Sequence, residues 1–181
     1  MMCKRTDVRG FTLIELMVVV ALVAVILVLV VPSFSSTLAR KRLEGAAAEL
    51  ATDIQYARSE AAQRNAAVRI IYGANCYAVH VVGSTNATDC SSLGTGAVEL
   101  KSVQVASGTT LAFVSNNSKA WFEFDAVRGM AVDSAGADSS GYVTATSAAG
   151  NWQIRAVVTT VGRLKVCSPN NTVTGMTADC S

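Results

Sequence analysis

The first strong pattern in the chain is an apolar run that begins at Phe11 and ends just before Pro32. It contains one charged residue, Glu15, in 21 positions. As an α-helix with a rise of about 1.5 Å per residue, the run would be roughly 31 Å long, which matches the hydrocarbon core of a bilayer. The sequence therefore predicts a transmembrane helix over residues 11–32. A carboxylate near its start would cost roughly 2.5–3.5 kcal/mol to insert, which is normally tolerated only for a function.

After Pro32 the apolar positions become periodic. They recur at steps of three and four residues, the spacing of one buried helical face, at Leu43, Ala47, Leu50, Ile54, Ala57 and Ala61. The polar positions that fall off this stripe are Glu44, Glu49, Asp53 and Arg58. Glu60 and Arg64 are four apart and can pair. The pattern predicts that the helix continues over residues 33–65, with the stripe packed against the core.

From Ala66 onward the pattern changes to that of β-strands, in which segments rich in Val, Ile, Thr and aromatic residues are separated by turn residues. The predicted strands are 68–72, 77–82, 98–106, 109–115, 120–125, 142–147, 152–160 and 163–167. Residues 83–96 and 132–141 are predicted to be surface loops, and a β-bulge near Ser102 would explain the imperfect alternation around it. The expected architecture is α+β: a long N-terminal helix packed on an antiparallel β-sheet, with residues 66–181 as one β-rich domain.

The start of the apolar run carries a specific motif. A short basic leader ending in Gly10 is followed by Phe11-Thr12-Leu13-Ile14-Glu15 and the apolar helix. This arrangement resembles the class III signal of type IV pilins and pseudopilins. The resemblance implies that a prepilin peptidase removes residues 1–10, that the new amino group of Phe11 is methylated, and that Glu15 pairs with the N-terminal amine of a neighbouring subunit. The alternative is an ordinary anchor or a secretory signal, whose apolar region of about 7–15 residues is shorter than this run.

The cysteines indicate an oxidising compartment. Cys3 lies in the leader, and the four that remain are Cys76, Cys90, Cys167 and Cys180. An even number beyond an export segment predicts two disulfides, with three connectivities open. We favour Cys76 with Cys90 and Cys167 with Cys180, because each pair flanks a loop rich in small polar residues. Metal binding is the alternative, but there is no CxxC spacing and only one histidine, so we expect neither a metal nor another cofactor.

Charge adds little to the choice of partner. Three of the 15 basic residues and one of the 13 acidic residues lie in the leader, so the mature chain has 12 of each. Attraction to nucleic acid would therefore come from a local patch. Basic residues flank the apolar run on both sides, so the positive-inside count is nearly tied. The cysteines favour a leader in the cytoplasm and a C-terminal domain outside it. The resemblance to type IV pilins implies that this domain lies in the periplasm and that the chain is anchored in a bacterial inner membrane.

A second resemblance rests on three motifs inside the domain. They are Ala57-Arg58-Ser59-Glu60-Ala61 leading to Arg64-Asn65 and Val68, Phe124 with Arg128-Gly129-Met130, and Gly162-Arg163-Leu164-Lys165-Val166-Cys167. In this order they resemble the GspH/FimT family of minor pilins and pseudopilins. The resemblance implies a pilin-like fold, other pilin or pseudopilin subunits as partners, and a place in a pilus after assembly. A FimT-like minor pilin and a GspH-like pseudopilin of type II secretion both remain open, since they share the N-terminal signal.

Enzymatic chemistry finds little support in the sequence. His80 lies in an apolar alternating stretch and is interpreted as a strand residue that faces solvent or is satisfied in the interior. Trp121, Phe122 and Phe124 are expected to divide between the core and a sheet face. No Ser/His/Asp grouping, phosphate loop or carboxylate pair stands out, so we expect no enzyme.

The last predicted hairpin is the candidate binding site. On a strand, Arg163 and Lys165 would project from one face, and Arg155, Arg128 and Lys119 could extend the patch. In the FimT branch, which serves DNA uptake in natural transformation, a GRxR motif here is associated with binding double-stranded DNA. The match is Gly162, Arg163 and Lys165, and the lysine keeps the charge but loses the bidentate fork. A solvated strand face would explain the alternation equally well.

Overall fold

The computed structural model of the protein describes residues 11–73, 75–85, 89–115, 121–133, 136–169 and 173–180. Within these ranges, the side chains of residues 28–33 and of Ser115 are outside the description. The predicted leader with Gly10, and Lys119 of the predicted basic patch, also lie outside the described residues. The chain divides into two compact units, Met1–Thr37 and Leu38–Ser181.

The longest element is helix α1, Leu13–Arg64. The residue before it, Thr12, caps the helix: its hydroxyl accepts a hydrogen bond from the N–H of Glu15 at 3.4 Å. A threonine followed three residues later by glutamate is the sequence of a capping box, and the acid also complements the helix dipole. The helix ends with a basic residue in its last turn and with Asn65 at a φ of +48°, a left-handed cap that asparagine tolerates. Helix over most of 11–65 was predicted, and the structure agrees to within two residues at each end.

The apolar start of α1 is exposed over the residues whose side chains are described. Every side chain from residue 11 to residue 27 is exposed. Among the described residues, no helical segment combines the length and the apolar character needed to cross a membrane. The span predicted over residues 11–32 extends into 28–33, whose side chains are not described, and it stays a prediction.

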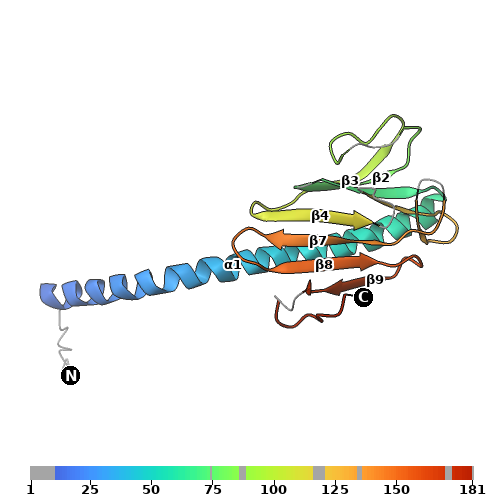
Figure 1. The fold of residues 1–181 in the computed structure, drawn as a ribbon. Coiled ribbons are helices and arrows are strands. Elements are labelled where there is room, and N and C mark those ends of the chain that lie inside the picture. The colour runs from blue at the N-terminus through green and yellow to red at the C-terminus, as the bar shows by residue number, and fades with distance from the viewer. Residues whose placement is uncertain are drawn as a thin grey trace, which may run out of the picture. The chain divides into compact units, whose positions relative to one another are not determined.

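The β-strands form two antiparallel sheets, where the sequence predicted one. Sheet 1 has the order β3-β2-β1-β5-β6, with β1 Val68–Tyr72, β2 Cys76–Val81, β3 Val98–Gln104, β5 Trp121–Phe124 and β6 Ala131–Val132. Sheet 2 has the order β4-β7-β8-β9, with β4 Thr109–Ser115, β7 Gly141–Ser147, β8 Gln153–Val158 and β9 Leu164–Cys167. Figure 1 shows the four strands of sheet 2 side by side. All eight predicted strands are present, and the two-residue β6 is the strand that the sequence did not predict.

The register of β2 with β3 locates the irregularity expected in β3. Val79 lies opposite Lys101, and the next residue, His80, lies opposite Glu99. Leu100 is therefore the extra residue of a bulge. Ser102, near which the bulge was predicted, pairs regularly with Ala78.

The core lies between the helix and the two sheets. All six predicted stripe residues of α1 are buried, with at most 4% of each exposed. Aromatic rings join the sheets: Phe113 of β4 stacks on Tyr72 of β1, with centroids 4.9 Å apart, and meets Phe122 of β5 edge-on at 4.7 Å. Both geometries are favourable for aromatic pairs. The shared core therefore holds residues 38–64 of α1 and both sheets together as one body.

The prediction that Asp53 lies on the polar, exposed face of the helix is wrong. The residue was expected to fall off the buried stripe, yet only 4% of it is exposed. The Tyr77 hydroxyl donates to Oδ2 at 2.7 Å, and the ammonium of Lys101 lies 2.8 Å from Oδ1 and also contacts Glu49 at 3.2 Å. A carboxylate can be buried when hydrogen bonds and an opposite charge satisfy it. Burial, and then the bond to Asp53, hold the pKa of Tyr77 well above its ordinary value.

The outer face of sheet 1 is covered by the segment between β2 and β3, predicted as a surface loop. Its Cys90 and Leu93 pack on a second small cluster that includes Trp121. The polar residues beneath are buried as well: Arg69 is 2% exposed and His80 is 1% exposed. His80 is thus an interior residue, and its Nδ1 has no hydrogen-bond partner among the described atoms. The interpretation of His80 as an interior residue is therefore confirmed, but its hydrogen-bonding capacity is not fully satisfied.

Candidate functional site

Three segments far apart in the sequence meet where α1 ends. Arg58 of α1 donates from Nη1 to the carbonyl of Gly162 at 3.1 Å and from Nη2 to that of Val161 at 3.5 Å. Gly129, in the connection after β5, lies against the same side chain: a Cβ added there would be 3.3 Å from Nε of Arg58. We call Arg58, Gly129, Val161 and Gly162 the Arg58 junction. Each of the three sequence motifs that suggested the GspH/FimT family contributes to it.

Glycine is required at position 162 for two reasons. The residue has a φ of +73°, which side chains disfavour. A Cβ there would also lie 2.6 Å from the carbonyl oxygen of Gly129. The loop is a three-residue hairpin: the N–H of Gly162 donates to the carbonyl of Thr159 at 2.8 Å, and the N–H of Thr159 donates to the carbonyl of Arg163 at 3.0 Å. Gly162 therefore shapes the turn and docks it on the helix.

Arg163 leaves this turn with its side chain exposed. Its strand was predicted to start at residue 163, but β9 begins one residue later, so Arg163 belongs to the loop. Its own N–H donates to the hydroxyl of Thr159 at 3.1 Å. Across the described part of the chain, no carboxylate lies within ion-pair distance of its guanidinium. Arg163 is thus a cation held on a fixed turn.

Lys165 has a different environment. Its ammonium lies 3.0 Å from the carboxylate of Asp179, a residue of the loop closed by the last disulfide. The two side chains are 39% and 67% exposed. Exposed ion pairs are worth about 0–1 kcal/mol, so a phosphate can replace Asp179 at little cost.

Arg155 lies on the same face of sheet 2 as Lys165. The register places Val157 opposite Lys165 and Arg155 opposite Cys167, and directly opposed residues share a face. The guanidinium carbon of Arg155 is 4.0 Å from the ring centre of Tyr142, and its Nε donates to the hydroxyl of Thr144 at 3.2 Å. The structure brings Arg155 and Lys165 together on one sheet face, and Arg163 leads into it.

Arg128 does not extend this patch as a free cation. Its Nε is 2.9 Å from the carboxylate of Asp125, and its Nη1 is 3.9 Å from that of Asp138. The hydrogen bond with Asp125 raises the pKa of Arg128 and lowers that of the acid. Arg128 is therefore already neutralised by neighbouring carboxylates.

Two disulfides close the loops predicted to need them. Cys76 is joined to Cys90 and Cys167 to Cys180, with Cα atoms 6.0 and 5.5 Å apart. In the chain-entropy model, loops of this length contribute about 3 kcal/mol each. These are the two pairs favoured from the sequence.

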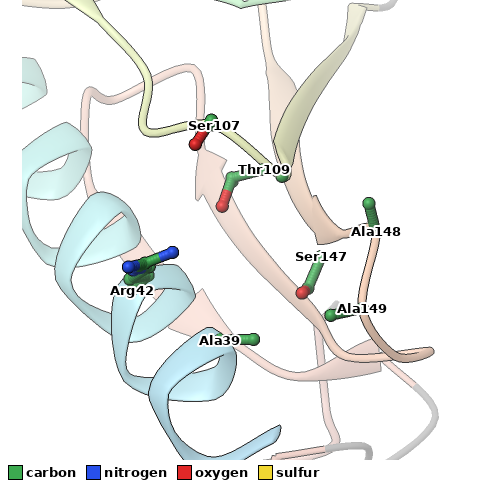
Figure 2. A pocket seen from close by; sticks show the side chains of 8 residues that line it. Ala39, Arg42, Ser107, Thr109, Ser147, Ala148 and Ala149 are labelled. Carbon is green, nitrogen blue, oxygen red and sulfur yellow. The ribbon is translucent and has the colours of Figure 1, made fainter. Parts of the chain in front are cut away.

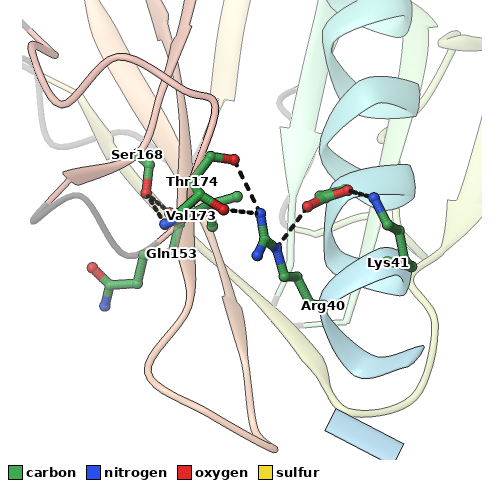
Figure 3. A network of polar contacts seen from close by, with 7 residues as sticks. Arg40, Lys41, Gln153, Ser168, Val173 and Thr174 are labelled. Carbon is green, nitrogen blue, oxygen red and sulfur yellow. Dashed lines mark hydrogen bonds and ion pairs between the residues drawn. The ribbon is translucent and has the colours of Figure 1, made fainter. Parts of the chain in front are cut away.

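The second disulfide loop is also fastened to α1. The Arg40 guanidinium donates to the carbonyl of Thr174 at 3.0 Å and to its hydroxyl at 2.7 Å (Figure 3). Glu44 holds the same guanidinium at 2.9 Å and the ammonium of Lys41 at 2.7 Å. Val173, in the same loop, is completely buried. The tail that carries Asp179 therefore has a defined position beside β9.

The predicted assembly residues lie at the other end of the chain. Phe11 is 79% exposed, and Glu15 is exposed in the first turn of α1. Besides its predicted contact with a neighbour, Glu15 has the local role in the helix cap described above. Gly10 is outside the described residues, so cleavage and methylation stay predictions.

The sequence did not predict the part played by Arg58. Its two carbonyl partners lie 103 and 104 residues further along the chain, and hydrophobic periodicity carries no information about such contacts. The available signal was that Arg58, Gly129 and Gly162 each belong to a motif of the same family.

The chain is similar to known proteins. Residues 46–162 match the family described as type II transport protein GspH, and residues 5–31 match the prokaryotic N-terminal methylation motif. The fold is similar to that of the type IV minor pilin FimU of Pseudomonas aeruginosa strain PAO1, with a TM-score of 0.55, 21% identity and coverage of 72% of this chain and 95% of that one. A second crystal form of FimU gives a TM-score of 0.53 at 19% identity, covering 70% and 97%.

The minor pseudopilin EpsH from the type 2 secretion system of Vibrio cholerae has a similar fold too. The TM-score is 0.54 at 9% identity, with 71% of this chain and 98% of EpsH covered. A search of curated protein sequences found no match. At these identities the solved structures establish a shared fold.

Proposed function

Because the chain belongs to the family of type II transport protein GspH, we propose that it is a minor type IV pilin of the FimT kind. In this proposal it takes part in pilus assembly and binds double-stranded DNA non-specifically, as in natural transformation. DNA binding rests on one observation: Arg163 is an exposed cation on a turn fixed by Arg58, with no carboxylate partner among the described residues. A guanidinium held in this way can bind a phosphate through two hydrogen bonds without first losing a competing ion pair.

Two further cations support Arg163. Lys165 can exchange the exposed carboxylate of Asp179 for a phosphate, and Arg155 lies on the same sheet face. Two or three phosphate contacts predict a shallow salt dependence, with a loss of affinity of roughly 10- to 40-fold between 50 and 200 mM salt. Contacts of this kind position the duplex without reading its bases.

Titration of the full chain in detergent with duplex DNA tests this site. We expect Arg163→Ala to weaken binding by about tenfold, since a charge-assisted contact is lost. Arg128→Ala is the matched control, because it removes the same charge from a guanidinium that Asp125 already neutralises; it should change affinity less than about twofold. Equal affinities for wild type and Arg163→Ala would reject the DNA site and leave the assembly role open.

The assembly role rests on the N-terminal segment. We propose that a prepilin peptidase cleaves after Gly10, that Phe11 is then methylated, and that the chain is held in the inner membrane with its C-terminal domain in the periplasm. The exposed apolar side chains of residues 11–27 need an apolar environment. The membrane supplies it first, and neighbouring pilin subunits supply it in the filament, where Glu15 meets an N-terminal amine. Glu15→Val should be cleaved normally but enter filaments poorly; normal incorporation would contradict this role.

A second candidate function is that of a GspH-like minor pseudopilin of a type II secretion system. It is favoured by the match to the GspH family and by the fold shared with EpsH. Deleting the gene separates the two proposals. Loss of transformation or twitching would support the pilus, whereas loss of exoprotein secretion would support the pseudopilus.

A further inference from the structure

A pocket of about 330 Å³ lies at the opposite end of β8 from the last hairpin. One wall is α1, which contributes Arg42, and the other consists of two turns, the β3–β4 turn and the β7–β8 turn (Figure 2). All its lining residues belong to the unit Leu38–Ser181. No function discussed so far uses this pocket.

Two buried hydroxyl groups open into the pocket. Thr109 and Ser147 are each only 4% exposed, yet their hydroxyls make no hydrogen bond to any residue that the structure describes. Neither oxygen is completely inaccessible to solvent, so both are reached from the open space of the pocket. Figure 2 shows them on the wall that faces α1, together with the hydroxyl of Ser107. Buried polar groups normally have a hydrogen-bond partner, so these two hydroxyls are available to a ligand that enters the pocket.

Arg42 supplies a positive charge to the same space. It is the third of three consecutive basic residues, and the two before it, Arg40 and Lys41, both form ion pairs with Glu44. Arg42 has no ion pair with any described residue. Figure 2 shows Arg42 on the α1 side of the pocket, across from the turn that carries Ser107 and Thr109.

Backbone hydrogen bonds fix the wall that carries Ser107, Thr109 and Ser147, which we call the hydroxyl wall, before any ligand binds. The N–H of Ala148 donates to the carbonyl of Gly108 at 2.7 Å and so joins the two turns. Within each turn, the N–H of Thr109 donates to Ala106 at 3.1 Å and that of Ser147 to Trp152 at 3.1 Å. The donor groups therefore need little reorganisation on binding, which favours affinity.

We propose that this pocket binds a phosphate group. A guanidinium fork and three hydroxyls converge on it from three segments, and no carboxylate lines it. Donors placed around a centre fit the oxygens of a tetrahedral phosphate better than the two coplanar oxygens of a carboxylate. The volume exceeds that of a bare phosphate, so the ligand is either the free ion or the phosphate of a larger molecule such as a lipid headgroup.

Phosphate binding is measured on the ¹⁵N-labelled full chain in a non-ionic detergent, by titration with inorganic phosphate and, separately, with short-chain phosphatidylglycerol. The amides of Gly108, Thr109 and Ser147 should shift in a saturable way. Arg42→Gln should weaken binding by about tenfold, and Arg42→Lys by less, because it keeps the charge and loses the fork. Lys41→Gln is the matched control, since it removes one charge from the adjacent position outside the pocket.

A separate substitution tests the contribution of the hydroxyl wall. Thr109→Val keeps the shape of the side chain and removes the hydroxyl, so affinity should fall severalfold while an unchanged melting temperature shows that the fold is intact. Saturation by phosphatidylglycerol alone would identify a lipid headgroup as the source, and saturation by both would identify the phosphate itself. The proposal is overturned if neither probe binds, if Lys41→Gln weakens binding as much as Arg42→Gln, or if acetate binds as tightly as phosphate.

Discussion

The outer face of sheet 1 is buried, whereas the outer face of sheet 2 is partly exposed. On sheet 1, a disulfide-closed loop covers the face, and Arg69 is buried with its guanidinium 2.7 Å from Glu123 and 3.9 Å from the ring centre of Trp121. On sheet 2, Arg155 and Lys165 lie on a face whose polar groups remain partly exposed. Charges of similar type are therefore buried in a structural pair on one sheet and lie on a partly exposed face on the other, where we propose that they bind DNA.

The largest expected effect comes from breaking the buried pair of sheet 1. Glu123→Gln removes the carboxylate that contacts the buried guanidinium of Arg69, so the free energy of unfolding should fall by about 3 kcal/mol or more. Urea unfolding of the full chain, followed by the near-ultraviolet circular dichroism of its two tryptophans, Trp121 and Trp152, measures this loss. The control is Asp179→Asn, which breaks the exposed pair of sheet 2 and should cost less than about 1 kcal/mol. Similar losses for the two variants would contradict the contrast between the sheets.

His80 makes the covered face sensitive to acid. Burial, and then the neighbouring charge of Arg69, lower the pKa of His80 to about 4. The folded state therefore keeps His80 neutral, while the unfolded chain takes up a proton below pH of about 6.5. The stability from this residue is complete above pH 6.5 and is lost as the pH falls toward 4, by up to about 3 kcal/mol.

Unfolding measured between pH 7 and pH 4 checks this sign. His80→Gln cannot titrate, so its free energy of unfolding should vary less over this range than that of the wild type. Parallel pH profiles for the two proteins would show that His80 does not cause the acid sensitivity.

The Arg58 junction should affect both stability and binding, each to a moderate extent. Arg58→Ala leaves the carbonyls of Val161 and Gly162 without their donor and should cost about 1–2 kcal/mol. Because these carbonyls belong to the turn that positions Arg163, DNA affinity should fall as well. Arg64→Ala, on the same helix but paired with Glu60, is the control and should leave DNA affinity unchanged. A destabilised Arg58→Ala protein with normal DNA affinity would restrict Arg58 to a structural role.

Local patterns predicted the elements well. The stripe of α1 is buried as periodicity indicated, Glu60 pairs with Arg64, and the GspH/FimT resemblance is confirmed by the family match. Each of these features depends on residues close in sequence or on a motif. The pilin-like α+β fold follows from them.

Features that depend on distant contacts were not predicted. The division of the strands into two sheets, the burial of Asp53 and the docking of Arg58 on the last hairpin are all decided by partners many residues away. The phosphate pocket was missed for the same reason, since Arg42 and the hydroxyls of Thr109 and Ser147 show no common pattern in the sequence. Alternation correctly placed Lys165 on an outer face, but it could not show that Asp179 lies beside it.

That carboxylate gives the smallest and most specific prediction. Asp179 forms an ion pair with Lys165 on the partly exposed face of sheet 2, so in the proposed DNA site it would compete with the duplex for the cation. Asp179→Asn should leave stability almost unchanged and raise DNA affinity about two- to threefold, with a steeper salt dependence because Lys165 then contributes one more released counterion. Combined with Lys165→Ala, the same substitution should have little further effect on affinity, because the cation it uncovers is gone. A gain of equal size in the double variant would mean that Asp179 acts by general repulsion of the duplex, and that Lys165 belongs to a solvated strand face and not to the DNA site.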